Sequence, residues 1–176
     1  TAALTMENET EGESSCDSLI LSEIMYMAND SEYVELYNCS NAEKNFTTLI
    51  IDIDGSNKSV SSVSIPAKSF YLLSRYDLTY LGVDHSVIST MNLSSTTGNW
   101  LTLRDENEKI IDRVAYAVKS NDLEWPYLTS QKHAIVLDSL CPDPEYNNFG
   151  RRWQEAESYI DQSVTQQKGT PGAAGR

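Results

Sequence analysis

Apolar and polar residues alternate in short runs through the middle of this chain. In the run EYVELYN, Val34 and Leu36 fall on one face of an extended strand. Tyr33, Glu35 and Tyr37 fall on the opposite face. Turn-forming residues separate such runs about every ten positions, as they do in all-β proteins. The pattern therefore predicts a fold built from short strands.

The expected strands cover residues 19–26, 32–38, 48–54, 58–65, 69–75, 99–105, 110–118 and 133–139. The pair Asp54-Gly55 is a hairpin signal, because both residue types tolerate positive φ. About 8–9 short strands favour an antiparallel β-sandwich, and closure into a barrel is the alternative. Residues 151–162 are interpreted either as a helix of about three turns or as an irregular arm.

Polar segments flank the strand region and define the expected domain organisation. Residues 1–18 are acidic and lack apolar periodicity, which is typical of a flexible arm. Residues 19–162 form the expected domain, and residues 163–176 are expected to be a Gly/Ala-rich tail. The sequence starts at Thr1, so we expect a mature form from which a targeting segment has been removed.

The charge balance limits the classes of partner. The chain of 176 residues has 26 Asp and Glu against 13 Lys and Arg, a net charge of −13. A negative field of this size repels phosphate backbones and anionic lipids, so we expect no nucleic-acid partner. No apolar run approaches the roughly 20 residues of a membrane helix, so we expect no membrane insertion. Protein partners or further copies of the chain fit better.

No motif for catalysis stands out. The two histidines, His85 and His133, lack a G-x-S-x-G elbow or another motif around them. Glu32 and Glu35 lie three residues apart on one expected strand and so point to opposite faces. We therefore expect no catalytic residue and no cofactor, and an enzyme of unknown type is the third functional class.

Asp52 and Asp54 belong to a D-I-D-G-S-N run that begins like a calcium-binding loop. Gly55 comes too early for an EF-hand, and the final glutamate is missing. A hairpin turn explains the same residues, so calcium at Asp52 and Asp54 is the weaker interpretation.

Aromatic residues are the remaining signal. Trp125 and Tyr127 flank Pro126 and could form a platform on which a sugar ring stacks. The alternative, which we favour, is that Trp100, Trp125 and Trp153 belong to the core or cover its ends. The face formed by Tyr33, Glu35 and Tyr37 is expected to meet solvent or a partner, because tyrosine offers contact area at low entropic cost.

The ordered set of segments resembles the lamin-tail domain in its bacterial extracellular form. The segments are LILSEIMY, EYVELYN, a D-x-D-G hairpin, SIPAKSFYLLS, GNWLTLRDENEKIIDRVAY, Trp125-Pro126, HAIVLD, Trp153 and GTPGA at residues 169–173. The resemblance extends over residues 19–173. It departs from nuclear lamins, because the chain lacks coiled-coil heptads and a basic face, so the partners of lamins are not carried over.

The resemblance implies an immunoglobulin-like β-sandwich without intrinsic catalysis, on a secreted or cell-surface protein. That habitat favours one disulfide, and we expect it between Cys16 and Cys141, which flank the first and last expected strands. The third cysteine, Cys39, would then be a free thiol.

Two functional classes follow. The leading one is a non-enzymatic module for protein or glycan interaction and adhesion. The alternative is a self-assembling structural subunit of a surface filament or layer, in which residues 1–18 or the C-terminal tail add a strand to the sheet edge of a neighbour.

Overall fold

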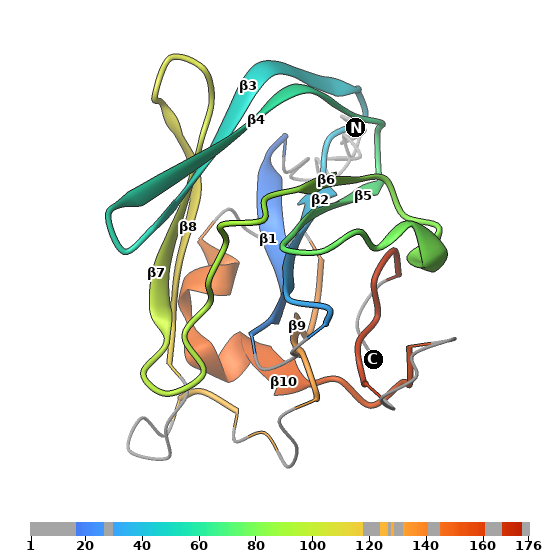
Figure 1. Ribbon diagram of the computed structural model, residues 1–176, viewed down its shortest axis with the longest axis vertical. Coiled ribbons are helices and arrows are strands. Elements are labelled where there is room, and N and C mark those ends of the chain that lie inside the picture. Colours follow the sequence, from blue (N-terminus) through green and yellow to red (C-terminus); the bar gives the residue numbers. More distant parts are fainter. Residues whose placement is uncertain are drawn as a thin grey trace, which may run out of the picture.

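The predicted all-β sandwich is confirmed by the computed structural model, which describes residues 17–26, 30–117, 124–126, 128, 132–140, 145–160 and 167–173 (Figure 1). Ten strands are present in these residues: β1 (Leu19–Met25), β2 (Tyr33–Asn38), β3 (Lys44–Ile53), β4 (Ser56–Ile65), β5 (Phe70–Ser74), β6 (His85–Val87), β7 (Asn99–Arg104), β8 (Ile110–Tyr116), β9 (Ile135–Leu137) and β10 (Trp153–Glu155). Three short 3-10 helices complete the described elements: η1 (Thr79–Leu81), η2 (Tyr146–Asn148) and η3 (Gly150–Arg152).

The strands form two sheets. One has six strands in the order β10-β9-β1-β2-β5-β6, and the other has four in the order β4-β3-β7-β8. All pairs are antiparallel except β5 with β6. In Figure 1 the four-stranded sheet arches over one side of β1 and β2, and the C-terminal segment lies on their other side.

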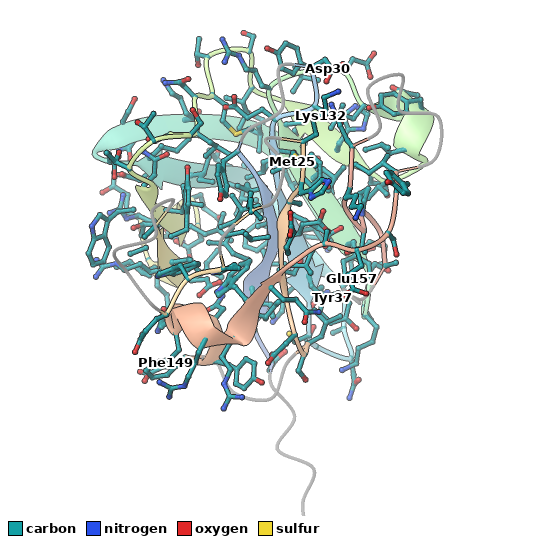
Figure 2. All side chains as sticks on the ribbon, turned by 90° about the horizontal axis from the view of Figure 1, so that it is seen from below. Met25, Asp30, Tyr37, Lys132, Phe149 and Glu157 are labelled. Atoms are coloured by element: carbon teal, nitrogen blue, oxygen red, sulfur yellow. The ribbon has the colours of Figure 1, made fainter. Side chains whose placement is uncertain are left out.

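Apolar side chains from both sheets meet in one core. Its fully buried members include Leu21, Val34, Leu36, Leu73, Leu49, Ile51, Leu101, Leu103 and Val114. Figure 2 shows this interior filled by side chains, with Phe149 at the rim of the molecule. The alternation of apolar residues at every second position explains why each strand contributes one face to this layer.

The six-stranded sheet is buried on its other face as well. A second cluster of buried residues covers that face: Met25, Tyr33, Leu72, Leu78, Ala134, Val136, Ala156 and Ile160. All seven residues of β1 are buried as a result. Alternation predicts a strand with one buried face and one solvent-exposed face. It therefore does not anticipate a strand such as β1 that is buried on both faces.

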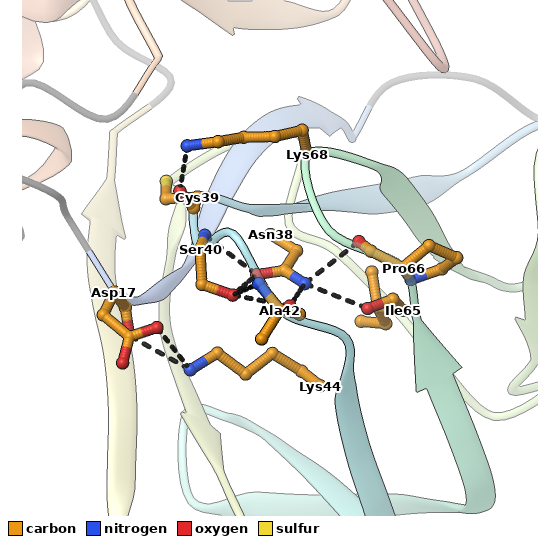
Figure 3. A network of polar contacts seen from close by, with 9 residues as sticks. All are labelled: Asp17, Asn38, Cys39, Ser40, Ala42, Lys44, Ile65, Pro66 and Lys68. Atoms are coloured by element: carbon orange, nitrogen blue, oxygen red, sulfur yellow. Dashed lines mark hydrogen bonds and ion pairs between the residues drawn. The ribbon is translucent and has the colours of Figure 1, made fainter.

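Two polar links join the sheets. Asp112 of β8 accepts hydrogen bonds from the backbone N–H of Leu21 (2.6 Å) and from Asn147 Nδ2 (2.7 Å). Leu21 directly precedes a register shift in the β1–β2 ladder, and its N–H bonds the Asp112 side chain there. At the end of β2, Asn38 Nδ2 donates to the carbonyls of Ala42, Ile65 and Pro66 at 2.9–3.0 Å and so fixes the passage of the chain between the sheets (Figure 3).

The C-terminal half departs from the expectations in two places. Residues 151–162 were expected as a helix or an irregular arm. In their described part, up to Ile160, η3 ends at Arg152 and β10 follows at Trp153–Glu155, so the helix is wrong there. Residues 163–176 were expected to be a tail, but Gln167 and Thr170 are buried and hydrogen-bonded to the rest of the protein. Trp153 explains the first departure, because its side chain is buried in the core from a strand that pairs with β9.

The cysteines depart from the expectation at Cys39, which the expected pairing left as a free thiol. Cys39 is buried and disulfide-bonded. Cys16 and Cys141, between which the disulfide was expected, lie outside the described residues.

We expect one free thiol per chain under denaturing, non-reducing conditions. Digestion without reduction should yield a cross-linked peptide that contains Cys39, and mass spectrometry identifies whether Cys16 or Cys141 is its partner. Three reactive thiols, or an alkylated Cys39 in the non-reduced protein, would contradict the disulfide.

The predicted Asp54-Gly55 hairpin is confirmed. Ile53 pairs with Ser56, and the two residues between them have φ of 50° and 83°, which is the conformation of a type I′ turn. A Cβ on Gly55 would contact no other atom within 4 Å, so only the backbone conformation requires glycine there.

Replacing Gly55 by alanine should lower the free energy of unfolding by about 1 kcal/mol, because alanine is strained at positive φ. Gly55→Asn is the matched control and should cost less, since asparagine tolerates this conformation. Urea denaturation measures both. Equal stability of the alanine variant and the wild type would show that this turn does not constrain the hairpin.

Candidate functional site

The face of β2 that was expected to meet a partner is covered. Tyr33 and Glu35 lie on the opposite face from Val34 and Leu36, as predicted, but they are 0% and 1% exposed. Tyr37 is half-buried, and its ring lies 4.6 Å from that of Phe70. Exposure of Tyr33 and Glu35 was therefore wrong, because residues 156–160 and 167–173 pack over this side of the sheet.

Glu23 joins Glu35 beneath this cover. The two residues are directly opposite each other in the β1–β2 ladder, and each is 1% exposed. Burial raises the pKa of Glu23 to about 7. The pKa of Glu35 is raised well above its ordinary value by burial and by the charge of Glu23. No signal within one strand could have revealed the pair, because its members come from different strands.

Residues 167–173, which we call the strap, supply most of the hydrogen bonds to this pair. The backbone N–H of Thr170 donates to both oxygens of Glu23 at 3.0 Å, and its hydroxyl donates to Oε2 at 2.8 Å. The N–H of Gly172 donates to Glu35 Oε2 at 2.6 Å. The Tyr33 hydroxyl also donates to Glu23 Oε1, and the Ser22 hydroxyl donates to Glu35 Oε1 at 2.8 Å. The pair thus fastens the end of the described chain to its first strands.

The sequence of the strap fits this site closely. A Cβ on Gly169 would lie 2.6 Å from Glu23 Oε1 and 2.7 Å from the Tyr33 hydroxyl, so no side chain has room there. Gly172 has φ of 78°, and the N–H of Ala173 bonds the carbonyl of Thr170 at 2.8 Å. This is a turn with Pro171 and Gly172 at its centre, where proline presets one angle and glycine supplies the positive one.

The calcium candidates are engaged by protein donors. Asp52 accepts the N–H of Gly55 at 2.7 Å and pairs with Arg104 at 3.3 Å. Asp54 accepts the N–H of Trp100 at 2.7 Å and a hydrogen bond from Asn99. The two carboxylates therefore organise the hairpin and its neighbour β7. Across the described ranges, no group of three or more His, Cys, Asp or Glu side chains is arranged to hold a metal ion.

The histidines lie apart from the buried carboxylate pair. His85 Nε2 is 3.2 Å from exposed Asp77. His133 is buried, and its Nδ1 bonds Glu155 of β10. Each histidine therefore has an acidic partner of its own.

The tryptophans divide into three environments. Trp153 is buried, as the core interpretation predicted, and its Nε1 donates to the carbonyl of Asn147 at 2.8 Å. Trp125 is partly buried with its ring 5.9 Å from that of Trp153, so it covers the core rather than forming an open platform. Tyr127 lies outside the described residues. Trp100 is 58% exposed, so its assignment to the core was wrong.

Trp100 belongs to the outer face of the four-stranded sheet. The guanidinium of Arg113 lies 5.7 Å from the centre of its ring. In the ladders of this sheet, Arg113 lies opposite Thr102. Arg104 lies opposite Ile50 of β3 on one side and Ile110 of β8 on the other. These side chains are therefore neighbours on the same face. Trp100, Arg113 and Ile110 are exposed. We call the set of Trp100, Arg104, Ile110 and Arg113 the tryptophan face. The alternation of Trp100 with buried Leu101 in the sequence could have revealed this face.

The comparisons add no assignment: no protein-family model and no curated protein matches the chain. Within the described residues, no helix has the length and apolar character needed to cross a bilayer. The assignment of function therefore rests on the two faces described above.

Thr170→Val should lower the free energy of unfolding by about 1 kcal/mol or more, because valine keeps the shape but removes a donor from a buried carboxylate. Thr96→Val, at an exposed threonine, is the control and should have little effect. Urea denaturation provides the measurement. Unchanged stability in the Thr170 variant would show that the strap does not depend on this hydrogen bond.

Proposed function

We propose that this protein is a non-enzymatic interaction module of lamin-tail type, secreted or displayed at a cell surface, which binds a protein or glycan partner through the tryptophan face. The observation that carries the proposal is Trp100, a large aromatic side chain that is 58% exposed near the start of β7 and stacked against Arg113. Tryptophan and arginine are the residue types enriched at the energetic centres of interfaces.

The two sheets differ in their availability to a partner. The six-stranded sheet is buried on both faces, with its outer face under the strap. The four-stranded sheet keeps exposed side chains in β4, β7 and β8. Arg104 is paired with Asp52, whereas the guanidinium of Arg113 lies over the exposed ring of Trp100, so the tryptophan face offers a cationic group beside an aromatic ring in a chain of charge −13. An acidic or neutral polymeric partner is therefore favoured over a basic one at this face.

An extracellular location has separate support. Cys39 is disulfide-bonded, and structural disulfides persist in oxidising compartments. The net charge of −13 also suits a soluble surface module, since it discourages non-specific association.

Self-assembly is the second candidate function, and the edge strand β4 favours it. This strand has ten residues, six of them exposed, and it pairs with β3 on one side only. Its sequence, SNKSVSSVSI, contains one lysine and no proline to discourage strand addition. Size-exclusion chromatography across a concentration series separates this function from binding by a monomer.

Trp100→Ala should weaken partner binding at least tenfold while changing stability by less than about 0.5 kcal/mol, because the side chain is largely exposed. The measurement is a screen of the labelled protein against arrays of glycans and surface-protein fragments, followed by titration of the ligands it binds. Arg113→Ala should weaken the same interactions.

Tyr159→Ala is the matched control, because Tyr159 is 63% exposed but lies outside the tryptophan face. Ligands whose binding is unaffected by Trp100→Ala would place the interface elsewhere. Turnover of a phosphodiester, ester or glycoside substrate by the purified protein would overturn the non-enzymatic proposal.

A further inference from the structure

The two glutamates beneath the strap form a buried acidic site. Among the described residues, all of their hydrogen-bond partners are neutral: Tyr33, Ser22, Thr170 and Gly172. The charge of Glu23 acts on Glu35, both glutamates and Tyr80 of η1 act on Tyr33, and Asp30 acts on Tyr80. Lys168 is the charged residue of the strap. The ammonium of Lys168 lies over the ring of Tyr159, 5.2 Å from its centre.

Two like charges at opposite ladder positions in such a site oppose each other, and neither is solvated. Such a pair keeps at least one proton until the pH is well above the ordinary range of carboxyl groups. The raised pKa values of Glu23 and Glu35 agree with this geometry. When the last proton leaves, a second negative charge appears in the site, and water must enter to stabilise it.

The strap supplies the contacts that a recognition site requires. Gly169 fits because no larger residue has room beside Glu23 and Tyr33. Thr170 provides two donors, and Gly172 provides a third in a conformation that favours glycine. Gly172 also closes against Val83, which a Cβ would approach to 2.7 Å. These features define a ligand of the class Gly-Thr-Pro-Gly.

We propose that the outer face of β1 and β2 is a proton-controlled binding site for a Gly-Thr-Pro-Gly segment, filled in this molecule by its own residues 169–172. The site holds the segment while Glu23 and Glu35 carry a proton between them, and it opens when that proton passes to solvent. The proposal concerns the six-stranded sheet and stands independently of the tryptophan face.

The direction of the pH effect follows from the raised pKa values. A carboxyl group whose pKa is higher in the folded state stabilises that state at low pH, and this contribution is lost as the pH rises through the folded pKa. For Glu23 the window runs from its ordinary value of 4.5 to about 7, and for Glu35 it extends upward. The strap is therefore held most firmly under mildly acidic conditions.

Amide hydrogen exchange of the full-length protein, followed by NMR between pH 5 and pH 9, tests the proposal. After correction for intrinsic exchange, protection of the Thr170 and Gly172 amides should fall about tenfold per pH unit for each proton that opening releases, from the ordinary carboxyl range up to the raised pKa values of the pair, and should level off above them. Protection of the Leu103 amide, in the core strand β7, should stay constant over the same range. Constant protection at Thr170 and Gly172 would overturn the proposal.

Glu35→Gln is the informative variant, because it mimics a pair that always carries one proton. The amide oxygen can accept the N–H of Gly172, and the amide nitrogen can donate to the Ser22 hydroxyl. Strap protection should then lose the pH dependence that Glu35 contributes and keep only the part that falls in the window of Glu23, from 4.5 to about 7. Glu32→Gln, at a buried glutamate that instead bonds Leu93 and Arg75, should retain the wild-type pH dependence.

A pH dependence that is identical in Glu35→Gln and the wild type would overturn the proposal. Should the variant fail to fold, the carboxyl carbon shifts of Glu23 and Glu35 in the wild type decide the matter. Titration of either group above pH 6 supports the shared proton, and titration of both near their ordinary values rejects it.

Discussion

Two carboxyl groups lie opposite each other between two layers of protein. The packing of the strap over the six-stranded sheet depends on their charge. Glu23 and Glu35 are buried, and none of their hydrogen-bond partners in the described part of the chain is a cation. Burying a carboxylate without a partner is costly, so neutral donors must be brought to it. Those donors come from Thr170 and Gly172, which explains why a polar segment at the end of the described chain is ordered at all.

This arrangement also separates the roles of the two sheets. The six-stranded sheet is covered on both faces and acts as the rigid centre of the molecule. The four-stranded sheet contributes one face to the core and leaves the other accessible. The accessible face of β3, β4, β7 and β8 therefore carries Trp100 and Arg113, which provide a large aromatic surface and a charge.

Much of the fold could be predicted from local pattern. Period-two alternation located most strands, and Asp54-Gly55 specified its turn, because both depend on neighbouring residues only. The tryptophan face could have been predicted in the same way, since Trp100 alternates with Leu101 and Leu103. The short strands β6 and β10 offered too few residues for a pattern to be recognised.

The buried pair could not have been predicted from the sequence. Alternation assigns Tyr33 and Glu35 to the face opposite the core, and it cannot reveal that distant residues cover that face. Strap residues are polar and rich in glycine, a composition shared by flexible tails, and only their hydrogen bonds to Glu23 and Glu35 distinguish the two cases. The spacing of cysteines in the sequence likewise does not identify the partner of Cys39, because a disulfide depends on proximity in space.

The strap has a consequence for biosynthesis. Thr170 bonds Glu23 across a separation of 147 residues, and β1 also pairs with β9, which precedes the strap by only about 30 positions. A ribosome therefore releases β1 and β2 long before the residues that cover them exist. Until then Glu23 and Glu35 remain hydrated and ionised, so this part of the sheet matures only once the strap has been synthesised and displaces the water.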